Sequence, residues 1–228
     1  MVAVLKNQDA SNLYYNPKIH MGKNLEPQCK QCRRVGEKLF LKGDRCLSAK
    51  CGLVKRNTIP GFHGPKGRKR LSDFGLQLTE KQKAKKYYNL LEKQFRLTFD
   101  KAKKKTGDAG KNFLKLLETR LDNTVYRLGL ATSRYESRQL VSHGHITVND
   151  KKVDIASYIV KTGDVVGICK KSLNNRFFRT ILERKNVERP SWLNWDAASK
   201  SGKVLHEPVD TDLPANLNVQ IIIEYYSK

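Results

Sequence analysis

Residues 120–153 show apolar positions that recur first with the period of a helix and then with the period of a strand. Leu121, Val125 and Leu128 are spaced so that they share one helix face. A glycine ends this segment, and Ser133 is a suitable N-cap for a second helix. The first part of the stretch therefore predicts two short amphipathic helices.

A tight hairpin is expected directly after these helices. Gly144 ends the second helix, and residues 145–148 alternate polar and apolar side chains, which is typical of a strand. The Asn149-Asp150 pair favours a two-residue turn that leads into a second strand.

Cations lie at outward positions of this scaffold. Arg134 and Arg138 are four residues apart and share one face of the second helix, while Lys151 and Lys152 follow the turn. An apolar frame that presents cations from a helix and a hairpin fits a phosphate-lined partner better than a small substrate.

The remaining chain predicts further helices before this stretch and strands after it. We expect helices after an N-cap at Thr79, over residues 90–105, and from Phe113 into the first helix above. We expect a strand at residues 165–169, a short helix near residues 176–185 and a final strand at residues 219–225. These elements predict the α+β class.

The formal net charge of +23 over 228 residues favours a polyanionic partner. Residues 62–105 hold 14 Lys and Arg against 4 Asp and Glu, whereas residues 186–228 hold 4 against 6. This concentration argues against a general solubility effect. It points to nucleic acid first and to an anionic membrane second.

Two segments have no helical or strand period. Residues 1–20 read as a peripheral extension with neither a signal nor a transit pattern, so we expect a soluble, intracellular protein. Residues 57–78 are rich in Gly and Pro and read as an extended loop. This loop supplies further candidate RNA-binding side chains: His63, Lys66, Arg68, Lys69 and Arg70.

Four of the five cysteines form the pattern C-x2-C-x13-C-x4-C: Cys29, Cys32, Cys46 and Cys51. A close pair places two thiolates on one side of a turn, and the spacer can fold as a hairpin that returns the second pair. The pattern predicts one structural zinc ion with a closed four-sulfur shell.

Other uses of these cysteines stay open. The same four cysteines could form two disulfides, remain buried free thiols or hold an iron–sulfur cluster. His20 and His63 are second-choice metal ligands. The isolated Cys169 is read as a small core residue.

Several stretches together resemble one protein family. They include CKQCRRVGEKLFLKGDRC, IPGFHG, LLETRLDNTVYRLGLATSRYESRQLVSHGHITVNDKKVD and the terminal IIIEYYSK. From about Met21 to Lys228, the chain resembles the bacterial-type small-subunit ribosomal protein S-four family.

The resemblance implies a mainly helical, zinc-containing domain with an inserted RNA-binding domain of the S-four type. The helical domain would comprise residues 21–117 and be completed by residues 184–228, and the inserted domain would comprise residues 118–183. Residues 1–20 would be an N-terminal extension.

The resemblance also implies partners and RNA-facing residues. Such proteins bind the 5′ region of small-subunit rRNA early in assembly, and they contact ribosomal protein S-five at a site linked to decoding accuracy. They also lie near the channel through which messenger RNA enters. The implied RNA-facing residues are Ser133, Arg134, Arg138, Gln139, His143, His145, Asn149, Lys151 and Lys152.

Two other function classes are weaker readings. An RNA-modifying or aminoacylating enzyme with the same small module would need a catalytic domain, and the sequence has no GxGxxG, P-loop or nucleophile motif. A zinc-dependent DNA-binding regulator would need a recognition helix and usually dimer symmetry. We therefore expect a ribosomal, non-enzymatic protein.

Overall fold

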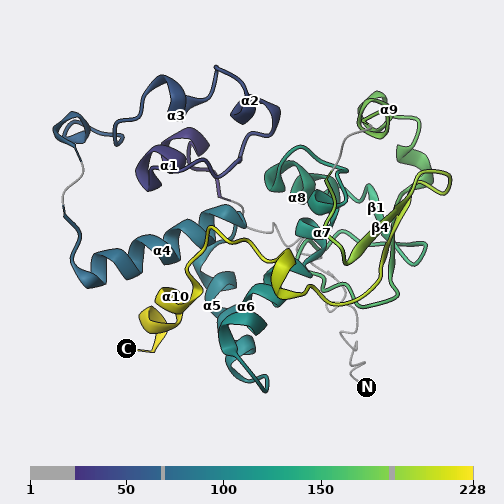
Figure 1. The fold of residues 1–228 in the computed structure, drawn as a ribbon. Coiled ribbons are helices and arrows are strands. Elements are labelled where there is room, and N and C mark those ends of the chain that lie inside the picture. The colour runs from purple at the N-terminus through teal and green to yellow at the C-terminus, as the bar shows by residue number, and fades with distance from the viewer. Residues whose placement is uncertain (1–23, 68–69, 185–187, 228) are drawn as a thin grey trace, which may run out of the picture.

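The structure is a computed structural model that describes residues 24–67, 70–184 and 188–227. A helical half lies beside a half built on a small sheet (Figure 1). This arrangement confirms the α+β class. Within the described ranges, no helix combines the length and apolarity that a membrane span requires.

The helical half contains seven of the labelled helices and one 3₁₀ turn. They are α1 (Gln28–Val35), α2 (Asp44–Leu47), α3 (Gly52–Lys55), η1 (Gly64–Lys66), α4 (Asp73–Tyr87), α5 (Glu92–Lys103), α6 (Ala109–Glu118) and α10 (Val219–Tyr226). The core lies between α4, α5, α6 and α10, where Phe95, Phe99 and Phe113 are buried edge to face. Of the apolar positions expected in the core from residues 90–105, Phe95, Phe99 and Ala102 are confirmed. Leu91, which shares their spacing, is 38% exposed because it precedes the first turn of α5.

Helix α4 begins earlier than the sequence pattern predicted. Its N-cap is Ser72, whose hydroxyl accepts a hydrogen bond from the backbone N–H of Gly75. Thr79, the predicted N-cap, lies inside the helix and its hydroxyl donates to the carbonyl of Gly75. The prediction was wrong because a threonine can bond back to the preceding turn as well as cap a helix.

The final apolar run is a helix and not the predicted strand. Helix α10 starts after Asn218, whose side chain caps it, and Ile222 is fully buried against the helical core. The β-branched residues favour a strand by propensity, but the run also has apolar side chains at helical spacing. Packing against α4 and α6 decides the outcome.

The second half carries a five-stranded antiparallel sheet in the order β2-β1-β3-β5-β4. The strands are β1 (Ile146–Val148), β2 (Lys151–Lys152), β3 (Val165–Ile168), β4 (Leu193–Asp196) and β5 (Ser201–Val204). Helices α7 (Leu121–Arg127), α8 (Arg134–Ser142) and α9 (Arg176–Leu182) and the 3₁₀ turn η2 (Lys170–Ser172) complete it, and a further turn, η3 (Asp210–Asp212), follows β5.

The predicted helix pair and hairpin are confirmed. Ser133 caps α8 by accepting from the backbone N–H of Glu136. Asn149 and Asp150 connect β1 to β2, and both have positive φ angles, 49° and 62°. Two left-handed residues in a row define the turn that matches the twist of a hairpin.

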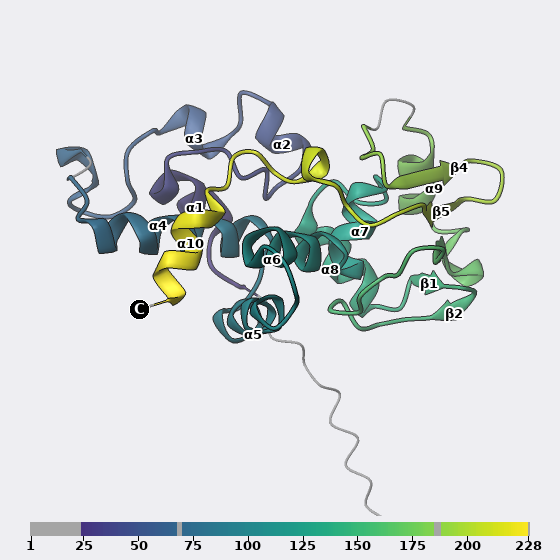
Figure 2. The ribbon, with the colours of Figure 1, turned by 60° about the horizontal axis from the view of Figure 1, so that its bottom comes forward.

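The C-terminal segment is divided between the two halves. Strands β4 and β5 join the sheet, and Trp192 lies in the core of the second half. The chain then crosses back to α10 in the helical half (Figure 2). The expected completion of the helical domain by all of residues 184–228 therefore applies to α10 and not to the sheet strands.

The cysteine-bearing segment has only a small core of its own. Its buried apolar cluster consists of Cys32, Leu39 and Leu41, with Tyr87 of α4 packed against it. The spacer between Cys32 and Cys46 consists of the end of α1, turns and the start of α2. Within the described residues it contains no strand, so the expected hairpin is absent. The burial of the two leucines fixes this spacer.

Candidate RNA-binding surface

The two arginines of α8 are buried. Arg134 is 6% exposed, and its guanidinium carbon lies 3.9 Å from the ring centre of Tyr87 and 4.5 Å from that of Tyr126. Its Nε donates to Asn123 at 2.8 Å. These cation–π and hydrogen-bond contacts hold Arg134 within the protein.

Arg138 has a similar position. It is 7% exposed, and its Nη1 lies 3.4 Å from a carboxylate oxygen of Asp122, which also receives Arg120. Ser133 is buried as well, and its hydroxyl accepts the capping bond. These three predicted RNA-facing residues therefore lie in the interior of the structure, where their contacts hold the fold together.

The predicted residues that do reach solvent come from the end of α8 and from the hairpin. Gln139, His143, Lys151 and Lys152 are exposed and lie on one end of the second half. The first two come from the end of α8 and the two lysines form β2, and their exposure leaves this part of the predicted surface available to a partner.

Asn149 is exposed but its side chain closes the hairpin. Its amide donates to Asp164 at 2.8 Å, and its side-chain oxygen accepts from the backbone of Val165 at 2.9 Å. Through these bonds the Asn149 side chain connects the turn to β3 and has a structural role.

Cations that the sequence analysis passed over lie beside this surface. They come from η2 and α9 and are exposed: Lys170, Lys171, Arg176 and Arg179. The signal in the sequence was four basic residues within ten positions, but the fold was needed to bring them next to α8 and the hairpin.

The loop of the helical half supplies a second basic region. His63, Lys66 and Arg70 are exposed, whereas Arg68 and Lys69 lie outside the described residues, as do residues 1–20 with His20. Two lysines of α4 are not available to a partner. Lys81 and Lys83 are about 5% exposed and pair with Glu92 and Glu37.

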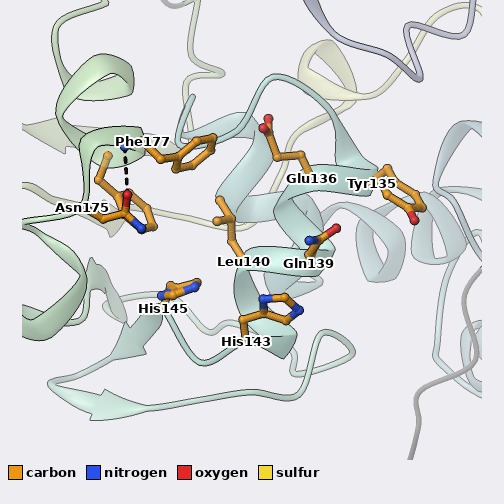
Figure 3. Close-up of a pocket in the computed structure, with 9 residues that line it drawn as sticks. Tyr135, Glu136, Gln139, Leu140, His143, His145, Asn175 and Phe177 are labelled. Carbon is orange, nitrogen blue, oxygen red and sulfur yellow. Dashed lines mark hydrogen bonds between the residues drawn. The ribbon is translucent and has the colours of Figure 1, made fainter.

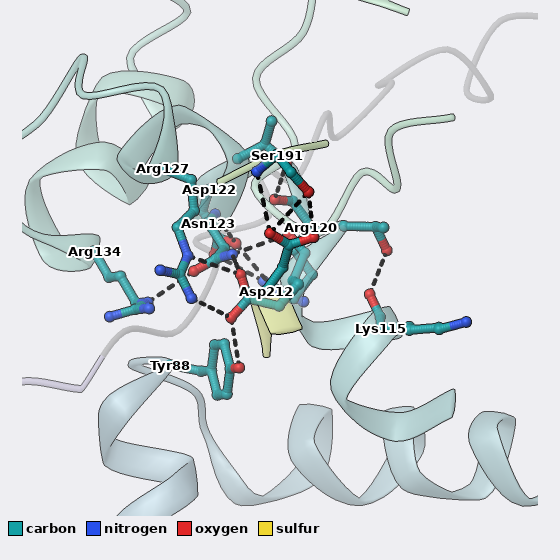
Figure 4. A network of polar contacts seen from close by, with 12 residues as sticks. Tyr88, Lys115, Arg120, Asp122, Asn123, Arg127, Arg134, Ser191 and Asp212 are labelled. Atoms are coloured by element: carbon teal, nitrogen blue, oxygen red, sulfur yellow. Dashed lines mark hydrogen bonds and ion pairs between the residues drawn. The ribbon is translucent and has the colours of Figure 1, made fainter. Parts of the chain in front are cut away.

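Glu118, the last residue of α6, is buried at the junction of the two halves. Its partners Tyr88, Asn123 and Arg127 are labelled in Figure 4. Its carboxylate accepts two bonds from Arg127, at 2.9 and 3.0 Å. It also accepts from the Tyr88 hydroxyl and from the Asn123 amide, both at 2.7 Å. One carboxylate thus connects α4 and α6 of the helical half to α7 of the other half.

The ionisation states follow from this arrangement. Burial raises the pKa of Glu118, but the charge and hydrogen bonds of Arg127, with Arg134 and Tyr88, outweigh it and lower the pKa below its usual value. Burial, with the charge of Glu118, raises the pKa of Tyr88 well above its usual value. Glu118 therefore remains an acceptor and Tyr88 a donor at neutral pH.

The four clustered cysteines converge on one small cavity. Cys29, Cys32, Cys46 and Cys51 all line a space of about 10 Å³, and no disulfide joins them. The backbone N–H of Lys42 donates to Cys46 at 3.3 Å. A shared cavity with sulfur donors from two chain segments fits a small thiophilic ion.

The cavity does not have the geometry of a formed metal site. In the described ranges, no group of three or more His, Cys, Asp or Glu side chains is arranged to hold an ion. His63 does not line this cavity, and Cys169 is half-buried elsewhere. The fit therefore rests on the convergence of the four thiols.

A helical half with a cysteine-bearing segment, joined to a helix–hairpin module with exposed cations, defines the class of RNA-binding proteins that carry an S4 domain. Residues 23–118 match the Ribosomal protein S4/S9 N-terminal domain, and residues 119–166 match the S4 domain. The boundary between the two matches falls at Glu118.

Similar proteins cover nearly the whole chain. Small ribosomal subunit protein uS4A of Alkaliphilus metalliredigens is 51% identical over 208 residues, which is 91% of this chain and 100% of that protein. The uS4 proteins of Clostridioides difficile and Acetivibrio thermocellus are 52% and 51% identical over 88% of this chain and 96% of theirs. The chain belongs to the uS4 family of small-subunit ribosomal proteins.

Proposed function

We propose that the protein is a structural constituent of the small ribosomal subunit, associated with cytoplasmic ribosomes, that binds small-subunit rRNA directly. The observation that carries the proposal is the pair of exposed basic regions in a uS4-family chain. The buried network around Glu118 holds the two halves together, so both regions can engage one RNA at a fixed spacing.

An enzymatic role has little support. The relatives are named as ribosomal proteins. His145 and Ser172 form a pair, with 2.8 Å between Nδ1 and Oγ, but among the described residues no carboxylate bonds to either. A serine and a histidine without a third group lack the orientation that nucleophilic catalysis uses.

Sedimentation tests the proposal. Most of the cellular protein should travel with small ribosomal subunits and their early assembly particles on a gradient. Recovery of the protein mainly in the free fraction would contradict the proposal.

The finer role that we propose is binding to the 5′ region of the rRNA, where the protein would nucleate early assembly. The less basic C-terminal region and the exposed apolar side chains of α4 suit protein neighbours. Phe74 is 55% exposed, and its ring lies 5.8 Å from that of Tyr225. We assign this patch to the contact with ribosomal protein S-five through which decoding accuracy is influenced, near incoming messenger RNA.

Replacement of Lys151 and Lys152 by alanine should weaken rRNA binding and reduce its salt dependence. Both side chains are exposed. The slope of log K against log salt is negative, and each phosphate contact that is lost reduces its magnitude by about 0.9. The double variant should therefore reduce the slope by about 2 in filter-binding titrations with the 5′ region of the rRNA.

A matched control removes the same charge from the less basic part of the chain. Lys200 and Lys203 are exposed around the β4–β5 hairpin, and their double alanine variant should keep most of the slope. Equal slopes for the Lys151/Lys152 variant and the unmodified protein would remove the β1–β2 hairpin from the interface.

We also propose one structural zinc ion held by the cysteine quartet. The support is the shared cavity of the four thiols and the small size of the apolar cluster beneath them. When bound, zinc would join the segments that carry the two cysteine pairs and so stabilise the fold.

A further inference from the structure

A pocket opens between α8, the residue before β1, and the start of α9 (Figure 3). Its volume is about 360 Å³, which lies within the range of small-molecule sites. Leu140 and Phe178 are buried and form part of its apolar lining, and Phe177 is half-buried at the same wall. An apolar wall with an aromatic ring suits a flat ligand group.

Polar side chains with unused hydrogen-bonding capacity surround this apolar wall. In the part of the chain that the structure describes, the Gln139 amide and the His143 ring form no hydrogen bond. Asn175 accepts from the backbone of Phe177 through Oδ1, and its amino group has no bonding partner among the same residues. The pocket can therefore meet a ligand with several donors without breaking the fold.

His145 adds a neutral ring to the pocket. Its Nδ1 is bonded to Ser172, and no described residue bonds to its Nε2, which is therefore available to a ligand. Burial, together with the charges of His143 and Lys152, lowers the pKa of His145. The imidazole is therefore mostly neutral at pH 7 and brings no positive charge into the pocket.

The charges around the pocket are separated. Glu136 lines the pocket, and its Oε2 accepts from the backbone and the hydroxyl of Thr132, both at 2.6 Å. The Lys152 ammonium lies outside, against Gly144, where an added Cβ would come within 2.6 Å of Nζ. A carboxylate inside the pocket repels a phosphate, whereas the cation beside it attracts one.

Further exposed cations lie on β2, η2 and α9, the last of which contributes Phe177 and Phe178 to the pocket. These cations are Lys151, Lys170, Lys171, Arg176 and Arg179. The pocket therefore suits a ligand with a neutral, flat group inside the pocket and an anionic group outside it. A nucleotide in a single strand has this charge pattern. A peptide side chain would not account for the basic surroundings.

We propose that this pocket receives one unpaired adenine or cytosine base of the bound RNA, with the adjoining phosphate at Lys152. Both bases have an exocyclic amino group beside a ring nitrogen that accepts. The Glu136 carboxylate can accept from the amino group, and the amide of Gln139 or Asn175 can donate to the ring nitrogen. Phe177 offers the ring for stacking. The inference rests on the proposed RNA-binding function and names the chemical group that this site takes.

Chemical probing of the full-length protein on the 5′ region of small-subunit rRNA tests the pocket. Dimethyl sulfate reports access to adenine N1 and cytosine N3, and hydroxyl radicals report access to the backbone. Gln139→Trp fills the pocket from an exposed position, Gln139→Ala removes one donor, and Ser142→Ala is the control on the same helix outside the pocket.

The unmodified protein and Ser142→Ala should protect at least one unpaired adenine or cytosine. Gln139→Trp should restore reactivity at that base and weaken binding by about tenfold, with the backbone footprint otherwise kept. Gln139→Ala should restore reactivity in part. Base protections that are unchanged in Gln139→Trp would overturn the pocket inference alone, whereas no backbone footprint with unmodified protein would overturn the proposed function.

Discussion

Replacement of Glu118 by alanine should lower the free energy of unfolding by about 3–5 kcal/mol, because Glu118 is fully buried and its loss leaves the partly buried Arg127 without its counter-charge. The substitution also leaves the Tyr88 hydroxyl and the Asn123 amide without their acceptor. Urea unfolding followed by circular dichroism measures the loss.

Two further variants distinguish a loss of stability that comes from the buried network from one that would follow the removal of any acidic side chain. Tyr88→Phe deletes one bond to Glu118 and should cost only about 1 kcal/mol. Asp210→Ala removes an exposed partner of Lys111 and should leave the unfolding midpoint nearly unchanged, because solvent screens that pair. Equal effects of Glu118→Ala and Asp210→Ala would show that the junction does not depend on the buried charge.

The contribution of Glu118 should also depend on pH. Because the pKa of Glu118 is lowered in the folded protein, its charge stabilises the fold fully above the ordinary glutamate pKa of about 4.3. This stability is lost as the pH falls through the lowered pKa. The difference between the unmodified protein and Glu118→Gln should therefore be complete at pH 7 and shrink below about pH 4.

If the proposed zinc ion is bound, its removal should unfold the cysteine-bearing segment and leave the two larger cores folded. The segment's own buried cluster has three residues, which is too small to hold residues 28–55 in place. Binding free energies of structural zinc sites are about 10–16 kcal/mol in small peptides, so chelation should remove most of the segment's stability. Hydrogen exchange of the backbone amides measures this loss by region.

Metal analysis and a cysteine control complete this experiment. The unmodified protein should contain about one zinc ion per chain, and Cys46→Ser should lose it and show fast exchange in α1 to α3. Cys169→Ser should keep the metal, because Cys169 does not line the cavity. A reduced, folded protein that contains no zinc would contradict the four-thiol site.

Local sequence patterns predicted those elements whose stability depends on nearby residues. The cap of α8 at Ser133 and the hairpin turn at Asn149 and Asp150 follow from side chains and backbone preferences within a few positions. The same reasoning was wrong at Thr79 and at α10, where a residue type fits two structures. At Thr79 the local bond to the Gly75 carbonyl and the cap at Ser72 decided the outcome, and at α10 packing against α4 and α6 decided it.

The predicted RNA-binding residues likewise depend in part on local sequence and in part on tertiary packing. Sequence spacing correctly placed Arg134 and Arg138 in one helix, but it does not state what that helix face meets. The aromatic rings of Tyr87 and Tyr126 and the carboxylate of Asp122 bury both arginines. The pocket beside α8 likewise requires α9, which is more than thirty residues further along the chain.

The sequence by itself determined the family, the helix–hairpin module and the basic character of the protein, because motifs, capping residues and charge are local or additive properties. The tertiary structure decided which cations face solvent, where the C-terminal segment divides, and which side chains meet in the pocket and around Glu118. These depend on contacts between residues far apart in the chain, and their burial and pairing arise only when the two halves pack together.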